Sequence, residues 1–347
     1  MDRFLFILSF IFVLSCSGNG ISDHDLPEEC GGKCYAAHDI DSLQDALIDS
    51  AAAFSNCVCL GGGVFEGNVT VGKPLMLLGR KDGSTYLKAL AVVDTSGVML
   101  RNLSFKNLST GSAALFISGS SVEMENISFS NIGASSVFGG RGIVVSGKGS
   151  EVFIKNSKME RTDGTGILIN GPHKIVLENV TLSKCGFTAL WAQNNSEERG
   201  SLSVSGGTFS DNGAAAVEIL GNTALQIYGS SVEGVRKRDV ALETVGDGIV
   251  VKNPFLAEKG SVTIENSSVS GFARAGVILD GVENPSSVGA SFKDLSVFSE
   301  QGSFGLVVQN ALEDASLREG IMRNDFSSSD MKRKNELFII DTFFELQ

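Results

Sequence analysis

Short segments in which apolar and polar residues alternate recur along most of the chain, at intervals of about 23 to 30 residues. Each repeat has a first alternating segment, a corner residue and a second alternating segment, and then a third segment that starts at a Gly or Ala. The third segments are residues 114–117, 142–145, 166–169, 189–192, 216–219, 248–251, 276–279 and 305–308. Alternation with a period of two predicts β-strands. The repeat therefore predicts a solenoid with three short strands and three turns in each unit.

The shortest turn of each unit lies at the corner between the first and second strands. Its central residue is always Asn, Gly or Asp: Asn102, Asn126, Asn156, Asn179, Gly206, Gly229, Asn266 and Asp294. These residue types tolerate the left-handed backbone conformation that a tight corner demands. Because strands stack about 4.8 Å apart, the corner side chains are expected to form a hydrogen-bonded ladder.

The repeats and the residues before them resemble the right-handed parallel β-helix, or pectin-lyase-like, superfamily. Residues 41–47 are similar to the capping helix with which members commonly begin, and residues 59–79 to the strand and glycine-rich turn that follow. The resemblance covers roughly residues 39–310. It implies an all-β fold, a right-handed single-stranded parallel β-helix over residues 39–315 with a short N-terminal capping helix. It implies little about activity, because the superfamily includes many enzymes and many non-enzymes.

The two ends of the chain differ from the repeats. Residues 4–15 form an apolar run after Arg3 that is too short to cross a bilayer, which predicts a signal peptide over residues 1–15. The run ends Val13-Leu14-Ser15-Cys16, which resembles a bacterial lipobox with Cys16 as the lipidated residue. The alternative is an ordinary secretory signal in which Cys16 has no role. Residues 16–38 are predicted to be a tether with a Cys pair, and residues 316–347 a C-terminal cap segment.

Four cysteines cluster at the start of the domain: Cys30, Cys34, Cys57 and Cys59. Export favours disulfides over a zinc site. Cys57 and Cys59 lie on one predicted strand and point the same way, so each is expected to bond a partner from the Cys30/Cys34 loop. Their connectivity stays open, and a four-thiolate zinc site is the alternative. Cys185, in contrast, is expected to be a small buried apolar residue.

The formal net charge of -12 argues against nucleic acid as a partner. The remaining candidate partners are a polysaccharide or a cell-surface protein, with membrane contact through the lipid anchor only.

The strands differ in the side chains that they direct outward. The second strands present only polar residues, whereas the third strands present seven apolar residues out of eight. This third-strand row consists of Phe116, Val144, Leu168, Trp191, Glu218, Val250, Ile278 and Val307. An apolar row of this length is larger than ordinary surface. It is either a groove for a ligand or a surface covered by the C-terminal residues 335–347. Longer loops on both sides of the third strand favour the groove.

Candidate site residues follow from the third strands. In enzymes of the superfamily the active site usually lies on the outer face of the matching strand. The predicted binding residues are Trp191, Gln193, Glu218, Lys252 and Asp280, with Arg236, Lys237 and Arg238 in the neighbouring loop. Glu218, Lys252 and Asp280 are the catalytic candidates. No cofactor is expected, except Ca²⁺ if the protein is a lyase.

Catalytic motifs of the superfamily are incomplete. Thr162-Asp163-Gly164 and Gly246-Asp247-Gly248 resemble polygalacturonase elements, but Gly248 replaces the second aspartate. Glu218 and Asp280 lie two repeats apart, about 10 Å, which exceeds the carboxyl separation of retaining hydrolases. The sequence therefore favours an exported, lipid-anchored and non-catalytic protein of the cell envelope, at the outer membrane or cell surface. A polysaccharide lyase, glycoside hydrolase or epimerase is the alternative.

Overall fold

The computed structural model describes residues 26–30, 34–48, 56–106, 113–133, 140–147, 149–240, 243–252, 262–280, 290–300, 302, 304–309, 325–328 and 338–340. The predicted signal peptide, Cys16 and the first part of the predicted tether lie outside these residues.

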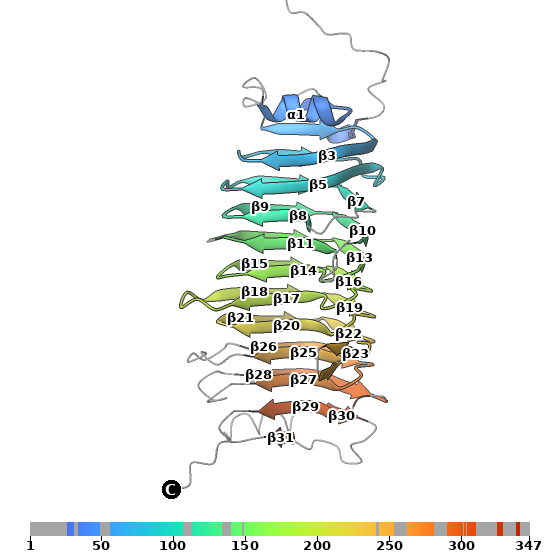
Figure 1. Cartoon of the computed structure of the whole chain (residues 1–347), viewed down its shortest axis with the longest axis vertical. Helices are drawn as coiled ribbons and strands as arrows, with labels where there is room; N and C mark the ends of the chain where they lie inside the picture. Colours follow the sequence, from blue (N-terminus) through green and yellow to red (C-terminus); the bar gives the residue numbers. More distant parts are fainter. Residues whose placement is uncertain are drawn as a thin grey trace, which may run out of the picture.

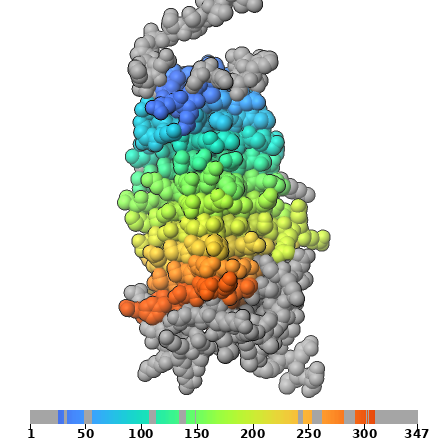
Figure 2. Space-filling view, turned by 180° about the vertical axis from the view of Figure 1, so that it is seen from behind, coloured from blue at the N-terminus to red at the C-terminus, as the bar shows by residue number. Residues whose placement is uncertain are grey.

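The described chain winds into a parallel β-solenoid whose turns follow one another along the long axis (Figures 1 and 2). The first strands are β6 (Val98–Arg101), β9 (Ser121–Glu125), β12 (Glu151–Lys155), β15 (Lys174–Glu178), β18 (Gly200–Ser205) and β21 (Thr223–Tyr228). The second strands are β7 (Ser104–Lys106), β10 (Ser128–Ile132), β13 (Lys158–Thr162), β16 (Thr181–Ser183), β19 (Thr208–Ser210) and β22 (Ser231–Glu233). In later repeats both strands join into β26 (Val262–Ser270) and β28 (Ala290–Ser299).

The third strands match all eight predicted segments. They are β8 (Ala113–Ser118), β11 (Arg141–Ser146), β14 (Ile167–Asn170), β17 (Leu190–Asn194), β20 (Ala215–Gly221), β25 (Asp247–Lys252), β27 (Ala275–Asp280) and β29 (Phe304–Gln309). Each pairs in parallel with the third strand of the next repeat. The predicted fold class, a parallel β-helix with a short N-terminal helix, is confirmed.

Alternation sends one apolar face of every strand into a continuous core. Residues at equivalent positions, such as Leu100 and Met124 or Val152 and Ile175, are paired in register and are at most 2% exposed. Phe105 and Phe129 stack with ring centroids 4.8 Å apart. This continuous apolar contact stabilises the stack, because a single repeat cannot bury its own apolar face.

The corner residues have the backbone conformation that the sequence predicts. All eight have positive φ angles between 48° and 63°. The side-chain Nδ2 of Asn126 donates to Oδ1 of Asn102 at 3.2 Å, and the side-chain Nδ2 of Asn179 donates to Oδ1 of Asn156 at 3.3 Å. The predicted ladder is therefore confirmed at these two steps.

Glycine near the start of a third strand has a steric cause. A Cβ atom on Gly166 would lie 2.5 Å from the carbonyl oxygen of Ala189 and 3.0 Å from Sγ of Cys185. The next strand and the core leave no room for a larger side chain at this position. The small residue that marks each third segment in the sequence is thus a packing requirement of the stack.

The N-terminal end is closed by helix α1 (Ile40–Ile48), which Figure 1 shows at the end of the solenoid, next to the strands nearest the N-terminus. The helix begins with a reciprocal cap. Oδ1 of Asp39 accepts a hydrogen bond from the Ser42 amide at 2.8 Å, and Oγ of Ser42 accepts one from the Asp39 amide at 3.1 Å. Leu43 and Ala46 of this helix are fully buried and form part of the main hydrophobic core. The predicted capping helix is confirmed.

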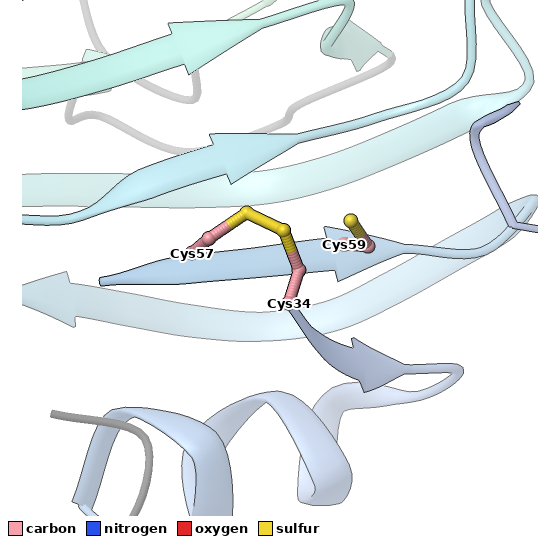
Figure 3. A group of neighbouring side chains, drawn as sticks. All are labelled: Cys34, Cys57 and Cys59. Atoms are coloured by element: carbon pink, nitrogen blue, oxygen red, sulfur yellow. A yellow bond between two sulfur atoms is a disulfide. The ribbon is translucent and has the colours of Figure 1, made fainter. Parts of the chain in front are cut away.

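Two disulfides join the beginning of the chain to β2 (Cys57–Leu60). Cys30 bonds Cys59 with Cα atoms 6.1 Å apart, and Cys34 bonds Cys57 with Cα atoms 4.7 Å apart. Figure 3 shows the second bond, with Cys59 beside it on the same strand. Each β2 cysteine therefore bonds a partner from the preceding loop, as predicted. Because these bonds use all four thiols, the structure favours disulfides over the zinc alternative. Cys185 is fully buried, and burial raises its pKa to about 11.

Parallel strands occur on both sides of the domain boundaries expected at residues 39 and 315. At the N-terminal end, a 3₁₀ turn (Glu28–Cys30) precedes β1 (Tyr35–Ala37), which pairs with β2, and β3 (Gly63–Val71), β4 (Met76–Leu78) and β5 (Thr85–Val93) follow. At the other end, β30 (Asp325–Ser328) pairs with β28 and β31 (Phe338–Ile340) pairs with β29. Within the described residues, no helix has the length and hydrophobicity that a membrane crossing requires.

Candidate functional site

The outer face of the third strands carries two parallel rows of side chains. The third-strand row runs in register through Leu168, Trp191, Glu218, Val250, Ile278 and Val307. A second row, two residues further along each strand, runs through Asn170, Gln193, Leu220, Lys252 and Asp280. The five predicted third-strand site residues therefore share one face. Asp280 is displaced from Glu218 by two strands and by two residues along the strand, so the two carboxyl groups do not face each other directly.

Most of the apolar third-strand row is buried, so of the two alternatives that the sequence left open, an open apolar groove along the whole row is not the one observed. Phe116 is 37% exposed, whereas the other aliphatic members are at most 8% exposed: Val144, Leu168, Val250, Ile278 and Val307. Part of this burial comes from contacts between members of the row and their neighbours. Val250, Ile278 and Val307 pack with Ala215, Ala275 and Phe304 into a second apolar cluster, separate from the main core.

The C-terminal residues were the sequence's candidate cover for this row. Residues 338–340 form β31, which pairs with β29 as the next strand of the stack. They therefore extend the sheet at its end and do not lie over Trp191. The rest of residues 335–347 lies outside the described residues.

An aromatic and cationic group lies beside the middle of the row. The rings of Phe187 and Trp191 are 5.9 Å apart and inclined at 55°. The Arg238 guanidinium lies 5.3 Å from the centroid of Phe187. Arg238 belongs to a hairpin of β23 (Arg238–Val240) and β24 (Glu243–Val245), which forms within the long loop between β22 and β25. In Figure 1 the hairpin lies beside β22 and β25. The insertion predicted from loop length thus positions a cation on this face.

Trp191 combines an accessible ring with an unsatisfied polar atom. The side chain is half-buried, and its indole Nε1 is buried with no hydrogen-bond partner among the described residues. A buried indole N–H normally donates to an acceptor.

Glu218 lies next to Trp191 on the adjacent strand and is half-buried. Burial raises the pKa of its carboxyl group above the ordinary value. The nearby Lys252 and a 3.3 Å hydrogen bond from the Thr188 hydroxyl oppose this shift, and Asp247 adds to it. Glu218 is therefore a carboxyl group with an increased tendency to carry a proton, as general acids require.

Asp247, unlike Glu218, is held in a buried ion pair. It is 2% exposed, and Arg274 binds both of its carboxylate oxygens, with the Nε–Oδ1 distance at 2.8 Å. The Ala275 amide donates to the same Oδ1 at 3.2 Å. This bidentate pair occupies the carboxylate, so the residue of the partial polygalacturonase element anchors the start of β25 and is not poised to react.

The predicted basic cluster is divided by the structure. Arg238 contacts Phe187, whereas Arg236 and Lys237 are exposed and line a separate hollow of about 510 Å³. That hollow also includes Phe298, which is 48% exposed, and the acidic residues Asp211 and Glu300. Arg236 and Lys237 therefore do not join the group around Trp191.

Other residues noted in the sequence have local structural roles. Thr162 is buried and donates to the carbonyl of Gly164 at 3.2 Å. His173 is 3% exposed, its Nε2 lies 2.7 Å from the Asn170 carbonyl, and burial lowers its pKa. Among the described residues, the one group of three closely spaced Cys, His, Asp or Glu ligand atoms consists of Cys34, Cys57 and Cys59, which form disulfides. A calcium site on the third-strand face is therefore not identified within the described part of the chain.

The sequence did not indicate three residues that contact this site: Phe187, Thr188 and Arg274. Each lies in a turn before a third strand, where alternation no longer indicates side-chain direction. The position of an aromatic residue shortly before Trp191 was the one available signal for Phe187.

The family model described as "Right handed beta helix region" matches residues 88–255. No curated protein sequence matches the chain. Several solved structures are similar at low identity, including the following three. The mannuronan C-5 epimerase A-module of Azotobacter vinelandii is 16% identical, with a TM-score of 0.44 over 80% of this chain and 72% of that chain. The surface adhesin PfbA of Streptococcus pneumoniae is 12% identical, with a TM-score of 0.37 over 87% of each chain. The catalytic domain of a GH87 alpha-1,3-glucanase is 12% identical, with a TM-score of 0.35 over 89% and 68%. These values concern the fold alone.

Proposed function

We propose that this right-handed parallel β-helix is an exported protein that binds an extended glycan on the outer face of β17, β20 and β25. The observation that carries the proposal is the convergence of Phe187, Trp191 and Arg238 beside Glu218 and Lys252. Aromatic rings provide apolar platforms for the flat faces of sugar rings, and the neighbouring polar groups provide hydrogen bonds to hydroxyls.

Export is supported by the two disulfides, because such bonds persist in oxidising compartments. We further propose that Cys16 carries lipid and that residues 17–29, which precede the first disulfide-bonded cysteine, connect the solenoid to the membrane. In this arrangement the protein displays its third-strand face at the cell surface, where a polysaccharide or a surface protein is the available partner.

A second candidate function, polysaccharide cleavage or epimerisation, is favoured by one observation. The raised pKa of Glu218 would let this residue act as a general acid, with Lys252 nearby to stabilise an anion. Glycan binding without turnover is the preferred proposal, because Asp247 is occupied by Arg274 and Asp280 does not face Glu218.

Trp191 allows a direct test because it is the one tryptophan of the chain. The full-length protein is screened on a glycan array, and the best oligosaccharide is titrated while the fluorescence of Trp191 is followed. Trp191→Phe retains a ring and Trp191→Ala removes it. We expect the alanine variant to bind at least tenfold more weakly by calorimetry, and the phenylalanine variant to retain part of the affinity.

The matched control is Phe153→Ala, which removes a half-buried outward aromatic side chain from β12, a first strand. Its affinity should equal that of the wild type. Ultraviolet absorbance of an unsaturated product and reducing-end release are followed with the same oligosaccharide. Turnover that Glu218→Gln abolishes would replace the binding proposal with the catalytic one. An array on which no glycan binds, or unchanged affinity in Trp191→Ala, would remove the proposal.

A further inference from the structure

A polar groove runs along the corner between the first and second strands, away from the third-strand face. We call it the corner groove. It is a hollow of about 920 Å³ whose lining includes Tyr86, Lys106, Asn126, Ser128, Lys158 and Thr181. A further hollow of about 540 Å³ continues along the same corner in later repeats, where Gly206, Thr208 and Ser231 contribute.

The floor of the corner groove is a straight column of side chains. Tyr86 pairs with Ser104, and the column continues through Ser128, Lys158 and Thr181. The four strand-to-strand steps span about 19 Å at the usual spacing of parallel strands. A linear polymer of several sugar residues fits this length, whereas a single small molecule would contact only part of it.

The corner groove is locally positive although the whole chain is strongly acidic. Its lining contains four cationic side chains and two carboxylates, against a net charge of -12 for the protein. Both carboxylates are already paired. Arg80 holds the pKa of Asp82 well below its usual range, and a 3.0 Å ion pair with Lys184 lowers the pKa of Glu160. Two of the four cations are also engaged: Arg80 pairs with Asp82, and Lys81 with Glu29.

Lys106 and Lys158 are the cations left for a ligand. Both side chains are exposed, and neither forms an ion pair with another described residue. Nζ of Lys106 lies 5.6 Å from the centroid of the half-exposed Tyr86 ring. One end of the corner groove therefore presents an aromatic platform and an ammonium group together. Lys158 presents a second ammonium group two strands further along, with hydroxyl and amide groups between them.

We propose that the corner groove binds a linear acidic polysaccharide. The Tyr86 ring would stack on a sugar face, Lys106 and Lys158 would pair with acidic groups, and the Ser, Thr and Asn side chains would bond sugar hydroxyls. This site is separate from the third-strand face and does not rest on the function proposed for it.

The test compares an acidic and a neutral oligosaccharide of equal length, oligogalacturonate and maltoheptaose, by calorimetry with the full chain. We expect the acidic chain to bind and the neutral one not to bind, with affinity falling as salt is raised. Lys106→Ala/Lys158→Ala should weaken binding about tenfold or more. The matched control is Lys88→Ala/Lys174→Ala, which removes the same charge from exposed positions elsewhere, and its affinity should be unchanged.

Trp191 separates this proposal from the previous one. Binding in the corner groove should leave the fluorescence of Trp191 unaltered, and Trp191→Ala should bind oligogalacturonate as the wild type does. A heparin-derived oligosaccharide, tested in parallel, shows whether sulfate or carboxylate is preferred. Equal affinity for the neutral chain, wild-type affinity in the Lys106→Ala/Lys158→Ala variant, or no binding of either acidic chain overturns the proposal. Loss of binding in Trp191→Ala alone would assign the acidic ligand to the third-strand face instead.

Discussion

Arg274 binds both carboxylate oxygens of Asp247 at the start of β25, and this pair joins two successive repeats on the third-strand face. Asp247→Asn removes the negative charge from a side chain that is 2% exposed and weakens its bidentate contact with Arg274, whose side chain is 32% exposed. We expect the free energy of unfolding to fall by about 1 to 3 kcal/mol, because a buried charge-assisted hydrogen-bonded pair loses one of its two charges. The thermal midpoint of the variant measures this loss. Glu151→Gln, which breaks the exposed 3.7 Å pair with Lys174, serves as the control and should change the midpoint little.

The register of the core predicts a strong contrast between two substitutions. Ile167 is 1% exposed, whereas Thr181 points outward and is half-buried. Ile167→Asp places a carboxylate in the dry core and should abolish folding, since an unpaired buried charge costs several kcal/mol. Thr181→Asp should fold with a near-native circular dichroism spectrum. Equal melting temperatures for the two variants would show that the register is wrong.

Glu218 predicts a pH dependence of stability with a defined sign. Its pKa is raised in the folded protein, so the folded state holds the proton more tightly than the unfolded state does. The associated stability is present below the ordinary pKa of 4.5 and is lost as the pH rises through the raised value. The melting temperature of the wild type should therefore fall, relative to Glu218→Gln, between acid and neutral pH. A difference that is constant with pH, or that grows in the opposite direction, contradicts this assignment.

The disulfides predict both a connectivity and a loss of stability. Peptide mapping without reduction should recover Cys30 linked to Cys59 and Cys34 linked to Cys57. Cys34→Ser/Cys57→Ser should lower the free energy of unfolding by about 2 to 4 kcal/mol, because the bond restricts the unfolded chain. Recovery of Cys30 linked to Cys57 would reject the assigned pairing. Cys185→Ser, which changes the unpaired buried thiol, is a comparison for the serine substitution itself.

Lipidation of Cys16 stays a prediction from the sequence. Cells grown with labelled palmitate should label the wild-type protein and not Cys16→Ser, and the variant should be released from the membrane fraction. A wild-type protein recovered unlabelled from the soluble fraction would remove the anchor from the proposed function, while the glycan-binding proposal would stand.

Local patterns in the sequence predicted the corners and strands because each depends on few residues. A corner needs one residue that accepts a positive φ angle. Residues such as Asn102 and Gly206 indicate this position by their type alone, independently of distant residues. Alternation predicted which side of β17 and β20 Trp191 and Glu218 occupy. Both signals are read within one strand or turn.

The sequence left open whether the outward row is buried, and it did not predict the residues brought in by turns. Val250 and Ile278 point away from the main core, yet neighbours from other repeats cover them. Arg238 lies over Phe187 because the intervening loop forms a hairpin, and Arg274 reaches Asp247 across 27 residues of chain. These contacts depend on how turns of different repeats meet in space, which periodicity does not encode.

The single-residue corner makes the two faces of this solenoid unequal in the changes that they can accommodate. Inserting one residue at Asn126 or Asn156 would reverse the alternation of the following strand and turn its apolar side chains toward solvent. The turns beside the third strand have no such restriction, and one of them already holds the β23–β24 hairpin. Length variation among descendants of this chain should therefore gather around Trp191. The distance between successive side chains along the corner groove should stay the same in those descendants, because the strand spacing of the backbone sets it.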